Sequence, residues 1–493
     1  MSKAAAEAKL STVFWVGMGL LLFSNFEALR AAPVPTAQGV LMIGVACLYP
    51  MYLWCEGKVR GMPVYPFFAL TYLWTFCLPL LTENPNIRQY SPEQQRFAAF
   101  TVTLFLFSGT FIWYKLVKRA TEPRIYMALA TRGAESFFIF MVAMGAFINM
   151  YRVGGWGFIS PTLFNILGKA VLGLSFLGIF MLAYRAGSGK MGQWKVRLFF
   201  IVLCLNIVSA AAGLILKTSL TLFMLSTFAF VVGGRRLPLL PVILGIVLLL
   251  PLHHGKHAMR HKYWEGPGHF VQPWEYPAWF AEWRDYSKEA QNRELSRYEA
   301  PAEEGESFLE RSSVIHMLML AQEKIPQDYP YLKGETYSYV PILIVPRALI
   351  KDKPVSHIGT HTLNVHIERQ TWEQTDKSTI AWGLLPEAYA NFGWLGAVVV
   401  GTFLGFFYGS MTAISVGTSA FSTRSMFTVL ILSFALASTE WTAGVYAAAL
   451  FQSAVPIAGM GIFMRLYRQK KKKYFPRSSL SGFNLSERKI FRS

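Results

Sequence analysis

The 493-residue sequence has little cysteine and no evident repeat, and each shortage excludes a class of protein. Its four cysteines, Cys47, Cys55, Cys77 and Cys204, lie in apolar runs without metal-ligand spacing, so we expect neither a disulfide framework nor a metal site. The lack of similarity between the two halves argues against the commonest secondary-transporter architectures. The first apolar run lacks a short core that ends at a small-residue cleavage site, so it predicts a membrane span and not a cleavable signal peptide.

Apolar residues dominate the chain. Hydrophobic residues make up 53% of it and aromatic residues 15%, and the mean hydropathy is positive. A helix of ~20 apolar residues crosses a hydrocarbon core of ~30 Å. Runs of that length predict an all-α polytopic membrane protein with about twelve spans, near 11–28, 38–55, 62–82, 97–117, 134–153, 163–184, 197–216, 217–234, 236–252, 390–412, 424–444 and 446–465. The pair at 197–234 could also be one long element.

The net charge of +19 is spread unevenly over the predicted loops. With the N-terminus in the cytoplasm, most lysines and arginines fall in the termini and the cytoplasmic loops. The short outer loops hold only Arg30, Arg88, Arg96, Arg152 and Lys217. This asymmetry is typical of membrane topology and places both termini in the cytoplasm. The basic run 468–473 then predicts contact with anionic membrane lipid and not with nucleic acid.

The topology divides the chain into four segments. Residues 1–252 form an N-terminal transmembrane bundle of about nine spans, and 253–389 form a large extracytoplasmic loop between spans nine and ten. Residues 390–466 add about three spans, and 467–493 form a basic cytoplasmic tail. The loop holds all nine histidines, and a connection of this length predicts a functional site.

Within this loop, the stretch 334–354, GETYSYVPILIVPRALIKDKP, joins a short apolar segment to a group of cations. The apolar part is too short to span and contains Pro341 and Pro346, which favours an interfacial or re-entrant segment. Arg347 and Lys353 would then lie at head-group depth, where a guanidinium can bind a phosphate or pyrophosphate with two hydrogen bonds. Snorkelling toward ordinary head groups is the alternative.

Two other parts of the loop have both a functional and a structural interpretation. The aromatic run 261–286, which includes Trp283, could stack on sugars or anchor the loop at the membrane–water interface. A capping box at Ser307 and Glu310 predicts a helix whose apolar face also carries Arg311. That arginine needs a partner, either in a structural ion pair or in a site.

Three charged residues, Lys169, Lys217 and Glu440, fall in the outer half of the predicted spans. Charges within spans are costly, so they indicate a function, and these three face the large loop. A transporter would tend to place them near the midplane of the membrane.

Four motifs resemble those of the Wzy-type oligosaccharide repeat-unit (O-antigen) polymerase superfamily of bacterial inner membranes. They are ERSSVIHML at 310–318, GETY at 334–337, PRALIKDKP at 346–354 and LLPEAYANFGWLG at 384–396. The spans and the one large external loop fit this family across nearly the whole chain. The family often has an arginine between the spans that precede the large loop, whereas this chain has Lys217.

The resemblance implies a GT-C-like, metal-independent glycosyltransferase without a cofactor, at the periplasmic face of the bacterial inner membrane. It would transfer a growing glycan from undecaprenyl pyrophosphate to the distal sugar of a lipid-linked repeat unit, with a chain-length regulator as an assembly partner. Cations would stabilise the leaving pyrophosphate, and a carboxylate or histidine would take the proton of the acceptor hydroxyl. The expected residues are Glu387, Glu335, His357 and His361 for catalysis, Arg311, Arg347, Lys353 and Lys217 for the pyrophosphate, and Tyr337, Tyr389 and Trp283 for the glycan.

Three other functions fit parts of the pattern. An O-antigen ligase would share the fold and the lipid-linked donor but would use a lipid-A core acceptor. A lipid-linked oligosaccharide flippase or another transporter would share the spans, but the large loop would then have no evident role. A non-catalytic partner in a polysaccharide export complex is the third.

Overall fold

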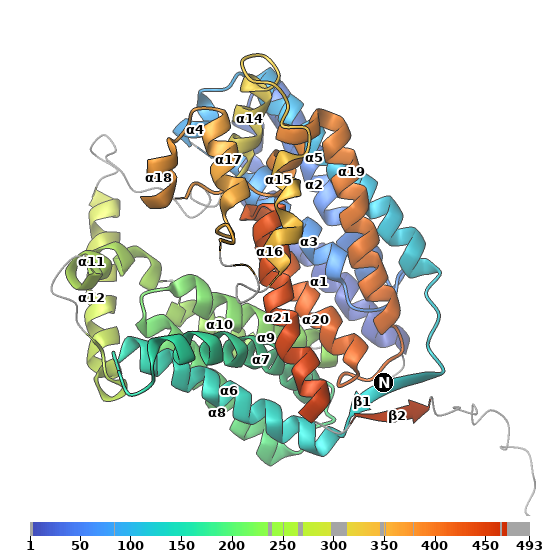
Figure 1. Ribbon diagram of the computed structural model, residues 1–493, viewed down its shortest axis with the longest axis vertical. Helices are drawn as coiled ribbons and strands as arrows, with labels where there is room; N and C mark the ends of the chain where they lie inside the picture. Colours follow the sequence, from blue (N-terminus) through green and yellow to red (C-terminus); the bar gives the residue numbers. More distant parts are fainter. Residues whose placement is uncertain are drawn as a thin grey trace, which may run out of the picture.

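The chain folds into two groups of long helices with shorter helices gathered at one end (Figure 1). This computed structural model describes residues 3–82, 84–234, 239–249, 251–264, 270–296, 313–345, 350, 352–377, 379–463 and 466–470. The first group consists of α1 (Lys3–Ala31), α2 (Val34–Cys55), α3 (Val64–Tyr72) with its continuations η1 (Leu73–Cys77) and η2 (Leu78–Leu81), α5 (Pro92–Lys118) and α19 (Leu384–Ser415). The second consists of α6 (Thr131–Val153), α7 (Pro161–Gly187), α8 (Gln193–Ala212), α9 (Leu216–Gly234) and α10 (Leu239–Leu249). Between them lie α20 (Thr423–Ala437) and α21 (Ala443–Phe463).

The helices support a multi-pass membrane protein. Among the described residues, eight helices are long and apolar enough to cross a membrane, or nine if the bent pair Pro241–Lys256 and Ala258–Trp264 forms one span. The helices Thr218–Gly233 and Thr423–Leu436 are apolar but shorter. The uncertain region 197–234 is two helices, because the chain turns at Gly213 and Leu214 between α8 and α9. A total of twelve spans stays a prediction.

The pair α5 and α19 shows how the first group is held together. At α5, Ser91 and Gln94 form a capping box, and Pro92 occupies the first turn, where its missing N–H costs nothing. A Cβ at Gly401 would lie 2.2 Å from the carbonyl oxygen of Phe105, so the two backbones touch where only a glycine fits. Such small-residue contacts are typical of helix pairs in membranes.

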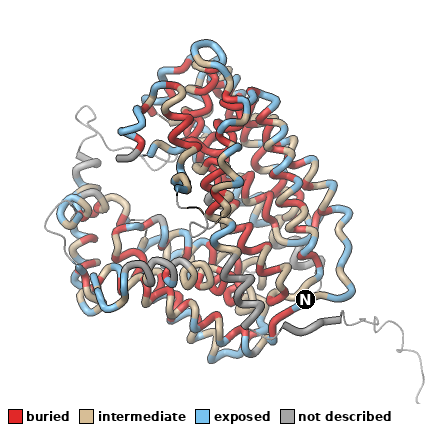
Figure 2. Tube along the Cα trace, in the orientation of Figure 1, coloured by how far each residue is buried: buried red, intermediate tan, exposed pale blue. Residues whose placement is uncertain are grey.

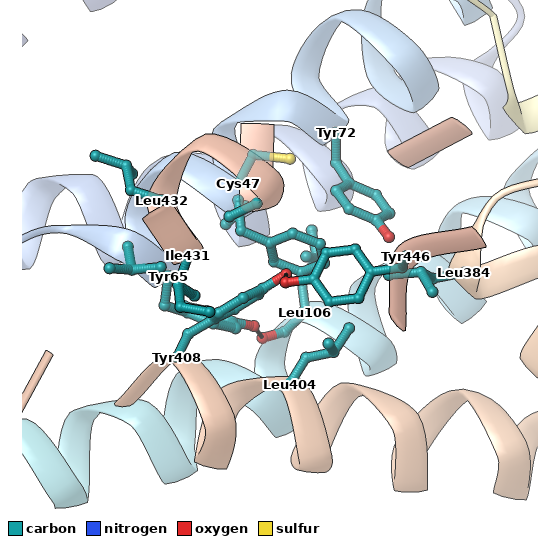
Figure 3. Close-up of a cluster of buried hydrophobic side chains, with 14 of the residues drawn as sticks. Cys47, Tyr65, Tyr72, Leu106, Leu384, Leu404, Tyr408, Ile431, Leu432 and Tyr446 are labelled. Atoms are coloured by element: carbon teal, nitrogen blue, oxygen red, sulfur yellow. Dashed lines mark hydrogen bonds between the residues drawn. The ribbon is translucent and has the colours of Figure 1, made fainter. Parts of the chain in front are cut away.

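A large core fills the space where α3, α5, α19, α20 and α21 meet (Figure 2). Buried tyrosines contribute to it (Figure 3). The Tyr408 hydroxyl donates to the Tyr446 hydroxyl at 3.2 Å, and the Tyr65 hydroxyl donates to the carbonyl of Leu106 at 2.6 Å. These bonds satisfy polar atoms where water is absent and tie α19 to α21 and α3 to α5.

A helical hairpin stands beside the second group and has a core of its own. It consists of α11 (Leu252–Trp264), η3 (Pro273–Glu275) and α12 (Tyr276–Ser296). Trp283 is fully buried in this core, and its indole N–H donates to the carbonyl of Leu252 at 2.8 Å. The expected stacking of Trp283 on a glycan is therefore wrong, because protein covers both faces of the ring, and the alternative of an anchor at the membrane–water interface stays a prediction.

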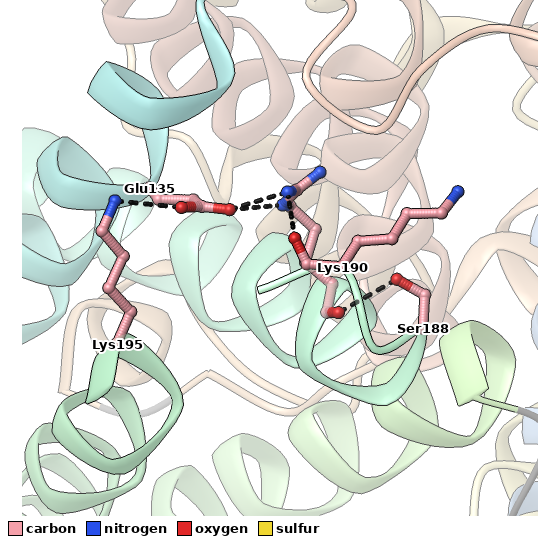
Figure 4. Close-up of polar contacts among 5 residues, drawn as sticks. Glu135, Ser188, Lys190 and Lys195 are labelled. Atoms are coloured by element: carbon pink, nitrogen blue, oxygen red, sulfur yellow. Dashed lines mark hydrogen bonds and ion pairs between the residues drawn. The ribbon is translucent and has the colours of Figure 1, made fainter. Parts of the chain in front are cut away.

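The end of the bundle formed by the start of α6 carries a buried ion cluster and a small sheet. The Glu135 carboxylate binds Arg185 Nη2 at 2.7 Å and Lys195 Nζ at 3.0 Å, which joins α6, α7 and α8 (Figure 4). Nearby, β1 (Ile125–Leu129) pairs antiparallel with β2 (Leu466–Lys470). The sheet brings the described C-terminal residues back to this end.

The opposite end carries the cap, which we define as α4 (Pro85–Arg88), α14 (Ile315–Lys324), α15 (Glu335–Ser338), α17 (Ile358–His366) and α18 (Trp372–Lys377). All but α4 come from the predicted large loop. The short helix α16 (Val340–Ile344) leads from the cap down along α21. The apolar part of the stretch 334–354 thus forms short helices, and α16 packs on α21, whereas its expected interfacial or re-entrant position stays a prediction.

Candidate functional site

The site is centred on Glu387, in the first turn of α19 where that helix meets α15, α17 and α21. The Glu387 side chain is completely buried. Its Oε2 accepts a hydrogen bond from the backbone N–H of Ala443 at 2.6 Å. Because Ala443 begins α21, the carboxylate caps the N-terminus of a second helix, where a negative charge is favourable. The sequence predicted either capping of its own helix or catalysis for Glu387. In the structure, the helix that Glu387 caps is α21 and not α19, on which it lies.

Asn391 connects this carboxylate to the GETY motif. Its Nδ2 donates to the carbonyl oxygen of Glu387 at 2.8 Å and to the Thr336 hydroxyl at 2.9 Å, and its Oδ1 accepts from the N–H of Gly334 at 2.9 Å. The amide is fully buried. Two of the motifs on which the resemblance depends, 334–337 and 384–396, therefore touch each other through one side chain.

The backbone of α19 breaks directly after Asn391. Phe392 and Gly393 have non-helical dihedral angles, and those of Gly393, φ 60° and ψ −143°, lie in a region that is almost restricted to glycine. The ring of Phe392 turns toward α15 and stacks on Tyr337 at 6.3 Å. The glycine of the NFG triplet thus separates the buried first turns of α19 from the long helix that follows.

Two polar atoms in this cluster make no hydrogen bond among the described residues, namely Glu387 Oε1 and the Tyr337 hydroxyl. Burial, and after it the Glu387 carboxylate, raise the pKa of the Tyr337 phenol well above its usual value, so the group remains an O–H donor. Thr336, whose oxygen accepts from Asn391, borders Glu387 Oε1 and still has its own proton to donate. A Cβ at Gly359 would lie 3.8 Å from Oε1, so α17 closes the other side with backbone.

Other expected residues lie at the rim of this cluster. Glu335 and His357 are exposed, at the starts of α15 and α17. His361 is buried, with Nε2 3.3 Å from the Thr379 hydroxyl. Tyr389 is also buried and lies beside Tyr331, so its ring is not open to a sugar.

The expected cations are not all brought together. Arg311 and Arg347 lie outside the described residues, as does the capping box at Ser307 and Glu310. Lys353 Nζ donates to the carbonyls of Leu343 at 2.6 Å and Val345 at 2.7 Å, which caps the C-terminus of α16. The side chain of Lys217 is not described, and its neighbour Leu216 packs in the core of the α11–α12 hairpin, away from α15 and α19.

Within the described part of the chain, no group of three or more histidine, cysteine or carboxylate side chains is arranged to hold a metal ion. Comparison of the chain with protein-family models, with curated proteins and with solved structures finds no match. The site is therefore interpreted from its own geometry.

Sequence reasoning missed three partners of Glu387. Ala443 contributes a backbone N–H, Gly359 contributes a surface without a side chain, and Thr336 contributes a hydroxyl. Backbone donors and glycine surfaces leave no pattern of residue types, so no signal pointed to the first two. Thr336 lies inside the GETY motif and could have been proposed from it.

Proposed function

We propose that this protein is a membrane glycosyltransferase that polymerises lipid-linked oligosaccharide repeat units, with its site where α15, α17, α19 and α21 meet. The support is the resemblance of the four motifs, together with the contact between GETY and the Glu387 segment through Asn391. The donor and the acceptor are both oligosaccharides on undecaprenyl pyrophosphate, presented on the periplasmic side of the bacterial inner membrane.

The observation that carries the proposal is the difference between the surroundings of the two Glu387 carboxylate oxygens. One oxygen is fixed by the backbone N–H of Ala443, and the other is buried with no backbone donor among the described residues and with the Thr336 hydroxyl as its neighbour. Capping of α21 needs only a neutral oxygen such as that of Ser, Thr or Asn, whereas burial of a charge is far more costly. A buried carboxylate with one oxygen that the backbone does not hold is typical of a residue that acts on a ligand.

The reaction needs a base and a stabilised leaving group. The acceptor hydroxyl oxygen attacks the anomeric carbon of the growing glycan, the bond from that carbon to the pyrophosphate oxygen breaks, and the lipid pyrophosphate leaves with the electron pair. In the proposal, Glu387 Oε1 takes the hydroxyl proton, and the Tyr337 hydroxyl donates a hydrogen bond to the acceptor. Cations of the stretch 346–354 stabilise the charge that develops on the pyrophosphate.

Access to Glu387 requires the cap to open. Thr336 on α15 and Gly359 on α17 lie against Oε1, and α15 has four residues and α16 five. Helices this short are held by packing and not by their own hydrogen bonds. Displacement of α15 from α17 would expose Oε1 and the Tyr337 hydroxyl together, at the level where the predicted loop meets the membrane.

Chain extension by the purified protein tests the proposal. The protein in nanodiscs is given lipid-pyrophosphate-linked repeat units, and the products are separated by length. A ladder of polymers supports a polymerase. Transfer of glycan only when a lipid-A core acceptor is added would indicate the ligase, and no new glycosidic bond with either acceptor would contradict a glycosyltransferase.

A further inference from the structure

A polar cavity lies in the cap, apart from Glu387 and outside all four motifs except for His316 of α14. The pocket, of about 240 Å³, is formed by residues of α4, of α14 and of the turn after α17. Its lining residues are Asn86, Gln89, Tyr90, His316, Leu320, Lys324, Ile367, Glu368 and Arg369. We call it the Arg369 pocket.

Arg369 is the notable member of this set. Its side chain is half-buried, and no carboxylate forms an ion pair with it among the described residues. Its described side-chain contact is a donation from Nη1 to the sulfur of Met317, which is a weak acceptor. Burial lowers the pKa of Arg369, which is the sign of a cation that lacks compensation.

The rest of the lining suits an anion. Lys324 adds a second positive charge, and Asn86, Gln89 and the buried Tyr90 add polar hydrogens. Burial, and after it Arg369, lower the pKa of His316 to about 4. The ring is therefore neutral at pH 7, and it does not repel the Arg369 guanidinium. Glu368 is the carboxylate among these lining residues, and it is exposed.

We propose that the Arg369 pocket binds an anionic substituent of the glycan, the carboxylate of an acidic sugar, through the Arg369 guanidinium and the Lys324 ammonium. The carboxylate matches the fork of an arginine, and the polar side chains of Asn86 and Gln89 line the same pocket. The pocket lies beyond Leu81, where the span Val64–Leu81 ends, so it faces a water-soluble glycan and not a lipid tail. The assignment of this carboxylate to a glycan rests on the proposed function.

Direct binding tests this proposal without any polymerase assay. The full-length protein in detergent is titrated with glucuronate, with inorganic phosphate and with glucose at constant ionic strength, and the dissociation constant is obtained from the rise in unfolding temperature. We expect glucuronate to bind and glucose not to bind. Arg369→Gln should weaken glucuronate binding about tenfold or more, and Arg369→Lys, which keeps the charge but loses the fork, should weaken it less.

Arg88→Gln is the matched control, because Arg88 is an exposed arginine on α4 that does not line the pocket. It should leave glucuronate binding unchanged. If phosphate binds and glucuronate does not, the ligand is not an acidic sugar, and a phosphate head group is indicated. Equal glucuronate binding in wild type and Arg369→Gln, or equal effects of glucose and glucuronate, would contradict the claim that the Arg369 pocket binds an anion. None of these outcomes depends on chain extension. The binding experiment can therefore contradict the Arg369 pocket without contradicting the proposed glycosyltransferase activity, and the reverse.

Discussion

The Glu387 carboxylate on α19 caps the N-terminus of α21 through Ala443, with Oε2 and the backbone nitrogen 2.6 Å apart. This bond joins two helices through residues that are 56 positions apart in sequence. It also orients the carboxylate, so that Oε1 faces Thr336 and Gly359. One oxygen of this side chain thus has a structural role, and the other faces α15 and α17.

Asn391 should be required for the cluster to form. Asn391→Ala removes the acceptor of the Gly334 N–H and the donor to Thr336, and a buried group left without a partner costs about 1–3 kcal/mol. We expect a lower unfolding temperature and little chain extension. Asn25→Ala is the control, because Asn25 is partly exposed and bonds only to its own helix turn among its described contacts. An Asn391→Ala protein with wild-type unfolding temperature would show that the amide network is not needed.

A disulfide between α15 and α17 should close the site reversibly. A Cβ at Gly359 would lie 3.6 Å from the Cβ of Thr336, which is within the range of natural disulfides. In a Cys204→Ser background, Thr336→Cys with Gly359→Cys should lose chain extension on oxidation and regain it with a reducing agent. Cys204 is replaced because it is the exposed native cysteine.

Each single cysteine variant serves as the control for this pair, and its rate of chain extension should be the same under oxidising and reducing conditions. Gly359 tolerates a side chain, since the nearest atoms would be at ordinary contact distance. Full activity of the oxidised double variant, with the disulfide verified by mass spectrometry, would mean that α15 does not have to move.

Glu135 should stabilise the other end of the bundle. Its carboxylate is buried between Arg185 and Lys195, so Glu135→Ala leaves two cations without their partner and should cost about 3–5 kcal/mol. Glu93→Ala removes half of an exposed ion pair with Arg96 and should cost at most about 1 kcal/mol. Unfolding in a denaturant compares them. Equal effects of the two variants would show that the cluster adds no more than a surface ion pair.

His316 should make stability depend on pH. Its pKa is lowered to about 4 by burial and by Arg369, below the ordinary value of about 6.5, so the unfolded chain binds the proton more readily than the folded one. This stability is fully present above about pH 6.5 and is lost as the pH falls toward 4, on the order of 1 kcal/mol at about pH 5.5. Unfolding temperatures of wild type and His316→Gln, measured over this range, should converge as the pH falls. Parallel curves would contradict the prediction.

The long elements could be predicted from the sequence because hydropathy and helical length determine them. Most of the twelve predicted ranges overlap a described helix, and the break between α8 and α9 lies where polar residues and Gly213 interrupt the apolar run. The apolar part of 334–354 forms short helices and no span, as its length and its two prolines predict, whereas its interfacial or re-entrant position stays a prediction.

The site could be predicted only in part. The motifs 334–337 and 384–396 begin 50 residues apart, and nothing in either one indicates that Asn391 binds Gly334 and Thr336. The role of Trp283 was mistaken because an aromatic ring in a loop has the same composition signal whether it faces solvent or a hairpin core. Arg369 left no signal, since its surroundings come from three distant segments of the chain.

Glu387→Gln tests the central claim most directly. The glutamine oxygen can still accept from Ala443, so the fold should be kept, with a change in the free energy of unfolding of about 1 kcal/mol or less. The amide cannot take a proton from the acceptor hydroxyl, so the rate of chain extension in nanodiscs should fall by on the order of a hundredfold or more. Glu93→Gln, an exposed glutamate on α5, should extend chains at the wild-type rate. Near-wild-type extension by a folded Glu387→Gln protein would contradict the account and leave Glu387 as a helix cap alone.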